Sequence, residues 1–139
     1  MFPIHRILHP TTFDSSDEAL GTACSLAQDY RAELIILHAV PLAAVMYGPP
    51  SESYLDHVLQ ELRCMRPDDP KVLVEHLVVE GDAAAQILKV AADSRCALIV
   101  MGTHGRTGVD RLLNGSVAEA VIRGASCPVL TVKEVDKGR

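Results

Sequence analysis

The stretch from Met101 to Ala118 (MGTHGRTGVDRLLNGSVA) contains the residues with the clearest chemical meaning in this chain. It begins where an apolar run at residues 97–101 (ALIVM) ends, and the last of its four glycines belongs to the pair Gly115-Ser116. Glycine permits positive φ and places no Cβ between the backbone and a ligand. A strand, a glycine-containing loop and a helix that begins at a serine suit phosphate groups, because free N–H groups and the helix dipole both favour an anion. The stretch therefore predicts a phosphate-binding loop.

The spacing of the glycines differs from the common phosphate-binding motifs. The loop contains neither G-x-x-x-x-G-K-S/T nor G-x-G-x-x-G. Gly102 is followed by two residues, Gly105, nine residues and then Gly115-Ser116. The alternative is turn chemistry with no ligand, in which Ser116 and Glu119 form the capping box of the last helix. That alternative leaves the spacing unexplained, and a cap and a phosphate ligand are compatible roles for one serine.

Composition restricts the classes of partner. The chain has 139 residues, of which 48% are hydrophobic and 22% charged, and its formal net charge is −5. Binding to a nucleic-acid backbone needs a basic face, and the sequence contains no run of Lys or Arg. Its apolar runs are too short to span a bilayer. We therefore expect a folded domain that binds neither nucleic acid nor membrane.

Cysteine and histidine spacing predicts no metal site. The four cysteines are widely separated and none belongs to a C-x-x-C pair, whereas metal sites usually show paired local spacing. No H-E-x-x-H motif occurs among the histidines. We expect His38 to pack or hydrogen-bond within the fold, and His5, His57 and His76 to lie at the surface. With no secretion signal at the N-terminus, reduced thiols in a cytoplasmic protein are expected.

Apolar patterning predicts five strands that alternate with four helices. The strands are predicted at residues 5–10, 33–40, 72–79, 97–101 and 128–134. Residues at helical spacing mark the helices between them, and Asp82 is the expected N-cap of the third. This alternation predicts an α/β fold, a doubly wound five-stranded parallel sheet of order 3-2-1-4-5 with helices on both faces, in one domain over residues 1–139. Glu75 and His76 interrupt the third strand, which is therefore placed near a sheet edge.

Ligands of such sheets bind outside the carboxyl ends of the strands, where the strand order switches. The ends of the first, second and fourth strands would converge there. These ends are Pro10-Thr11-Thr12, His38-Ala39-Val40 and Met101-Gly102. The glycine-rich stretch thus lies in the expected site.

The G-x2-G-x9-G-S/T spacing resembles the nucleotide-binding signature of the universal stress protein family. Further segments resemble that family in the same order along the chain: ILHPTTFDSS, LHAV, GDAAAQIL, CALIVMGTHGRTG and GSVAEAVIRGASCPVLTVK. The resemblance implies a Rossmann-like, cytoplasmic and usually dimeric protein that binds ATP, or AMP or ADP, as a regulatory ligand in a stress response. It leaves open whether Mg²⁺ accompanies the nucleotide.

The resemblance also implies two groups of nucleotide-binding residues. The adenosine would lie beside Pro10, Thr11, Thr12 and Ala39. The ribose and phosphates would lie against Met101, Gly102, His104, Gly105, Arg106, Gly115, Ser116, Val117 and Ala118. In the second group, backbone N–H groups and the Ser116 hydroxyl would bind phosphate, and Arg106 would add a charge-assisted contact.

One position departs from the family pattern. An Asp usually follows the Pro-Thr pair and contacts the adenosine, whereas this chain has Thr12 there. Threonine retains one hydrogen bond but not the carboxylate, a loss of about 1.5–3 kcal/mol of binding free energy. We therefore expect weaker or less base-selective binding.

The same residues leave other functions open. The strand from Pro128 to Glu134 would expose an apolar edge in a monomer, which favours a homodimer through that strand, as in the family. One alternative is a slow ATPase or nucleotidyl-transfer enzyme, for which His104 is the only candidate general base. Another is a family member that binds no nucleotide and acts through protein contacts, which Thr12 favours. A cyclic nucleotide or another phosphorylated metabolite is a further candidate ligand.

Overall fold

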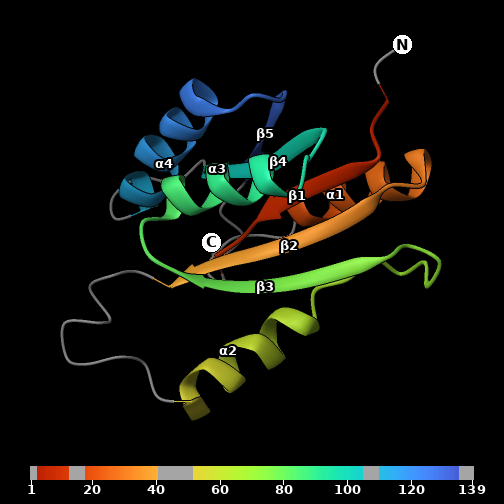
Figure 1. Ribbon diagram of the computed structural model, residues 1–139, viewed down its shortest axis with the longest axis horizontal. Helices are drawn as coiled ribbons and strands as arrows, with labels where there is room; N and C mark the ends of the chain where they lie inside the picture. The colour runs from red at the N-terminus through yellow and green to blue at the C-terminus, as the bar shows by residue number, and fades with distance from the viewer. Residues whose placement is uncertain (1–2, 13–17, 41–51, 105–109, 135–139) are drawn as a thin grey trace.

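The computed structural model describes residues 3–12, 18–40, 52–104 and 110–134. Within them, five strands alternate with four helices (Figure 1). The strands are β1 (Arg6–Pro10), β2 (Glu33–Val40), β3 (Val74–Glu80), β4 (Leu98–His104) and β5 (Val129–Glu134). The helices are α1 (Glu18–Tyr30), α2 (Glu52–Arg63), α3 (Ala83–Asp93) and α4 (Asp110–Gly124).

All five strands are parallel, and their order is β3-β2-β1-β4-β5, as the sequence predicts. The apolar run of β2 explains the arrangement. Leu34 and Ile36 belong to one hydrophobic cluster, whereas Ile35 and Leu37 belong to the other. A strand that is buried on both faces has no polar face, which is the pattern of a parallel sheet between two helix layers.

The two clusters show which helices cover each face. Ala23 and Ala27 of α1 pack in the first cluster with Leu62 of α2. Ile87 of α3 and Val121 of α4 pack in the second, so these two helices cover the opposite face (Figure 1). None of the helices in the described part of the chain has both the length and the apolar character to cross a bilayer.

The polar residues of β3 are explained by its position at the edge of the sheet. β3 pairs with β2 alone, which confirms the predicted edge position. Glu75 is exposed, but His76 is half-buried and its Nε2–H donates to the Met65 carbonyl at 2.8 Å. The expectation that His76 is a surface residue was therefore wrong, because its ring joins β3 to the segment after α2.

Helix ends are formed by local hydrogen bonds. The Asp82 carboxylate accepts from the Ala85 N–H at 2.9 Å, which confirms the predicted N-cap of α3. At the C-terminal end of α1, Arg31 has φ 55°, and the Ala32 N–H donates to the Ala27 carbonyl at 2.9 Å. This is the left-handed helix ending that glycine usually provides.

Substitution by alanine should change the stability of the fold in opposite directions at two glycines, one before α3 and one within α1. Gly81 has φ +129°, which alanine rarely adopts, so Gly81→Ala should destabilise the fold by about 1–3 kcal/mol. Gly21 lies within α1 with nothing within 4 Å of an added Cβ, so Gly21→Ala should stabilise by up to about 1 kcal/mol. Urea unfolding of both variants measures the two effects. If both substitutions change the free energy of unfolding in the same direction, this account is contradicted.

Candidate functional site

The candidate site is the place where β1 and β4 separate. The two strands pair only at Ile7–Leu98 and Leu8–Ile99, whereas β1 continues beside β2 as far as Pro10–Leu37. The strand order also reverses between β1 and β4, because β2 and β3 lie on one side and β5 on the other. An opening at the carboxyl ends of parallel strands is where ligands bind in such sheets.

His9 lies at this separation and is 3% exposed. Its Nδ1 is 2.9 Å from the carbonyl oxygen of Val100, on the neighbouring strand. A carbonyl oxygen only accepts, so Nδ1 carries the proton and the neutral ring has an unprotonated Nε2. Burial lowers the pKa of His9, and the bond to Val100 opposes that shift only in part. The imidazole is therefore neutral at pH 7.

The end of β1 is held from the other side by β2. The Thr11 N–H donates to the Leu37 carbonyl at 2.8 Å, and the His38 Nδ1–H donates to the Thr11 carbonyl at 3.0 Å. This bond confirms the expectation that His38 hydrogen-bonds within the fold. The Thr11 hydroxyl donates to the Thr12 carbonyl at 3.1 Å. The segment predicted to lie beside the adenosine is thus fixed at its backbone.

The second predicted segment lies beside the first. Ala39 pairs with Val79 of β3 and is half-buried, and the Gly81 N–H donates to the Val40 carbonyl at 3.0 Å. These contacts place Ala39 at the carboxyl end of β2, adjacent to the end of β1. The structure therefore brings Pro10, Thr11 and Ala39 into one region.

The fourth strand is longer than the sequence predicts. We expected it to end at Met101, but β4 continues to His104 because Gly102 pairs with Val132 and Thr103 with Lys133 of β5. Hydrogen bonding to β5 overrides the glycine signal. Met101 is buried, and Gly102 is half-buried within the strand.

The last helix also begins earlier than predicted. We expected Ser116 at its N-terminus, but α4 begins at Asp110, so Ser116 lies inside the helix and is not its N-cap. Ser116 is exposed, Val117 is half-buried, and Ala118 packs in the same cluster as Met101. The helix places these three residues beside β4, but the N–H groups free at its start belong to its first turn.

Some predicted site residues cannot be placed. Gly105 and Arg106 lie outside the described residues, and the side chain of His104 is likewise undescribed. Among the residues that the structure does describe, no group of three or more His, Cys, Asp or Glu side chains is arranged to hold a metal ion.

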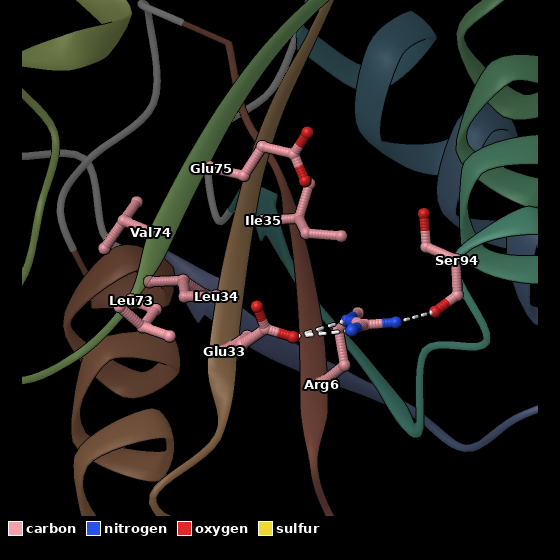
Figure 2. A pocket seen from close by; sticks show the side chains of 8 residues that line it. All are labelled: Arg6, Glu33, Leu34, Ile35, Leu73, Val74, Glu75 and Ser94. Atoms are coloured by element: carbon pink, nitrogen blue, oxygen red, sulfur yellow. Dashed lines mark hydrogen bonds and ion pairs between the residues drawn. The ribbon is translucent and has the colours of Figure 1, made fainter.

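Sequence reasoning missed an ion pair at the opposite end of the sheet. Arg6 donates to the Glu33 carboxylate, with Nε 3.0 Å from Oε1, and also to the Ser94 carbonyl (Figure 2). Ser94 is the C-cap of α3, where a cation satisfies the helix carbonyls and its dipole. Arg6 therefore joins β1, β2 and α3. A single Arg between His5 and an apolar run was the only sequence signal.

Two hollows open at this amino end of the strands. One of about 330 Å³ is bordered by Arg6, Glu33 and Glu75 (Figure 2). The other, of about 710 Å³, lies between the end of α1 and residues 69–73. Both are remote from the predicted ligand site, because β1, β2 and β3 are parallel and these residues lie at the starts of the strands.

Three of the four cysteine thiols lie in environments that disfavour the thiolate. All four cysteines are free. Burial raises the pKa of both Cys24 and Cys96 to about 11, and it also raises the pKa of Cys127. A thiol is nucleophilic as the thiolate, so these three are poor nucleophiles at neutral pH.

A doubly wound parallel sheet that opens at the switch in strand order is the architecture of many nucleotide-binding α/β proteins. The model of the Universal stress protein family matches residues 3–133, and the chain belongs to this family. Universal stress protein MJ0531 of Methanocaldococcus jannaschii is 34% identical over 145 residues, covering 95% of this chain and 84% of that protein.

Solved structures share the fold. Protein MJ0577 of the same archaeon superposes with a TM-score of 0.69 at 30% identity, covering 94% of this chain and 96% of that one. A universal stress protein in complex with cAMP has a TM-score of 0.63 at 24% identity, covering 94% and 98%. The Archaeoglobus fulgidus protein in complex with dAMP has a TM-score of 0.64 at 20% identity, covering 96% and 100%.

The buried His9 predicts that stability falls in mild acid. Its pKa in the fold is lower than the ordinary 6.5, so below pH 6.5 the unfolded chain binds a proton that the folded chain does not. Stability should therefore be complete above pH 6.5 and decrease as the pH falls to the folded pKa, by at most about 1.4 kcal/mol per pH unit.

Urea unfolding from pH 7.5 to pH 5 measures this dependence. The His9→Asn variant should lose part of it, whereas removing the exposed His57, which pairs with Glu61 at 2.7 Å, should leave the His9 contribution in place. An identical pH profile for wild type and His9→Asn would contradict the assignment.

Proposed function

We propose that this universal stress protein binds ATP, ADP or AMP as a regulatory ligand in a cytoplasmic stress response. The nucleotide would bind at the carboxyl ends of β1, β2 and β4. The observation that carries the proposal is the separation of β1 from β4 after Leu8 and Ile99, at the switch in strand order. Proteins of the same fold have been solved in complex with cAMP and with dAMP, which supports an adenine nucleotide as the ligand class.

The base side of the proposed site would consist of neutral polar groups. Thr11 is 9% exposed, His9 is a neutral imidazole, and Thr12 stands where the family usually has an Asp. Adenine is uncharged and offers hydrogen-bond donors and acceptors at its edge, so such groups fit it without a buried charge. Without a carboxylate, affinity and base selectivity should both be reduced.

The phosphate side depends on α4. In a helix that begins at Asp110, the N–H groups from Gly115 to Ala118 lie inside and are used by the helix. Phosphate binding by these four groups therefore requires α4 to begin later, near Gly115. Glycine within a helix costs about 1 kcal/mol relative to alanine, which makes this a weak point of α4.

Titration calorimetry with ATP and AMP tests the proposal. Wild type should bind both, and Gly115→Val should weaken ATP at least tenfold (about 1.4 kcal/mol) because the side chain blocks the phosphates. Valine is acceptable inside a helix, so the variant should fold. Gly21→Val is the matched control, since Gly21 is a helical glycine with open space around it. No heat with either nucleotide would refute the proposal.

We also propose a homodimer through β5. This strand lies at an edge of the sheet. Two apolar residues are exposed in this region: Leu130 on β5 is 39% exposed and Ile122 on α4 is 53% exposed. Pairing would cover an apolar edge that is otherwise open to aggregation. Val132 is unsuitable for a test because it packs against the core cluster, so its substitution would disturb the fold.

Leu130→Lys should shift the dimer to monomers in size-exclusion chromatography with light scattering. A charge placed on the pairing edge would have to be buried without a partner. The control is Leu73→Lys, which makes the same change at a residue 66% exposed, next to the opposite edge strand β3. If folded Leu130→Lys remains as dimeric as wild type, the interface lies elsewhere.

A further inference from the structure

Both sides of the carboxyl end of β1 are held by an imidazole. The His9 Nδ1–H donates to the Val100 carbonyl of β4 at 2.9 Å, and the His38 Nδ1–H of β2 donates to the Thr11 carbonyl at 3.0 Å. We propose that His9 and His38 are positioning residues, which set the separation of β1 from its neighbours and thereby the place where the base is bound. This inference rests on the proposed nucleotide site.

The direction of the backbone groups explains why His9 is needed. Along a strand, the N–H and C=O groups of successive residues point alternately to the two neighbouring strands. The Arg6 carbonyl accepts from Ala97 on the β4 side, and the Thr11 N–H donates to Leu37 on the β2 side. By this alternation the backbone of residue 10 points to β4.

Residue 10 is proline and has no N–H. The ladder therefore lacks a donor toward β4 where the Val100 carbonyl needs one. The imidazole of His9, the residue before the proline, supplies that hydrogen bond with its Nδ1–H. A side chain is longer than a backbone N–H, so the bond satisfies the carbonyl while the two strands stay apart.

His38 acts in the same way on the other side. The Thr11 N–H is bonded to Leu37, and the next donor of β2 toward β1 would be the N–H of Ala39. The ring of His38, the residue before it, donates to the Thr11 carbonyl instead. The Thr11 carbonyl is thus bonded to β2 through a side chain rather than through the backbone of Ala39.

Paired variants separate the hydrogen bond from the bulk of the ring. His9→Asn and His38→Asn place an amide N–H where Nδ1–H lies, whereas His9→Leu and His38→Leu remove the donor. Each Leu variant should weaken AMP about five- to tenfold, the value of one hydrogen bond. Each Asn variant should return to within about twofold of wild type. His57→Leu, at an exposed histidine, is the control.

Inorganic tripolyphosphate provides a second readout, since it contacts only the phosphate side. Its affinity should change less than twofold in the Leu variants, because the positioning acts on the base side. Equal losses of AMP and tripolyphosphate, or an Asn variant no better than its Leu counterpart, would overturn the inference. A folded His9→Leu that binds AMP like wild type would do the same.

A measurement without nucleotide separates this inference from the proposed function. The Thr11 amide, bonded to Leu37 at 2.8 Å, should exchange with deuterium about tenfold faster in the Leu variants than in wild type or His57→Leu. If wild type binds no nucleotide, the proposed function fails, and unchanged exchange at Thr11 would overturn the positioning role as well. Where His9→Leu does not fold, the half-buried His38 carries the test.

Discussion

The opening between β1 and β4, at the carboxyl ends of the strands, depends on one missing hydrogen-bond donor. β1 is the central strand, and every other strand lies on one side of it or the other. Pro10 ends its pairing with β4 because it has no N–H to offer, and the buried ring of His9 satisfies the carbonyl that is left. A buried carbonyl without a donor would destabilise the fold, so the His9 ring offsets the donor that Pro10 lacks. The candidate site exists because the strands separate there without leaving a polar group unsatisfied.

The two ends of the sheet have different roles. At the amino ends, charged groups join elements: Arg6 connects Glu33 on β2 with the C-cap of α3. At the carboxyl end of β1, the rings of His9 and His38 bond to backbone carbonyls, so these contacts fix the backbone rather than join charged groups. The Arg6–Glu33 ion pair thus lies at the opposite end of the sheet from the proposed base site. The two hollows also lie at the amino ends, far from the predicted ligand site.

The chain belongs to the universal stress protein family, and two local features bear on the proposed nucleotide site. Thr12 stands where the family resemblance implies an Asp, so in the proposed site the base would be recognised through weaker neutral hydrogen bonds. The helix α4 starts at Asp110 and encloses the N–H groups that the family pattern assigns to phosphate. Affinity for a nucleotide would then include the free energy of shortening a helix that contains Asn114 and Gly115, both poor helix formers.

The sequence by itself determined the features that depend on neighbouring residues. The unbroken apolar run of β2 indicated a parallel sheet with two covered faces, Asp82 indicated a helix start, and Glu75 placed β3 at an edge, all of which hold. The family resemblance predicted the region in which a nucleotide would bind. Only the tertiary structure decided that β4 extends to His104 and that α4 begins before Ser116. It also decided that the side chains of His9 and Arg6 donate hydrogen bonds to carbonyls distant in the sequence. The reason is physical, since His9 and Val100 are 91 positions apart in the sequence. Which carbonyl lacks a donor depends on how the strands pair, and the residues around His9 do not indicate that pairing.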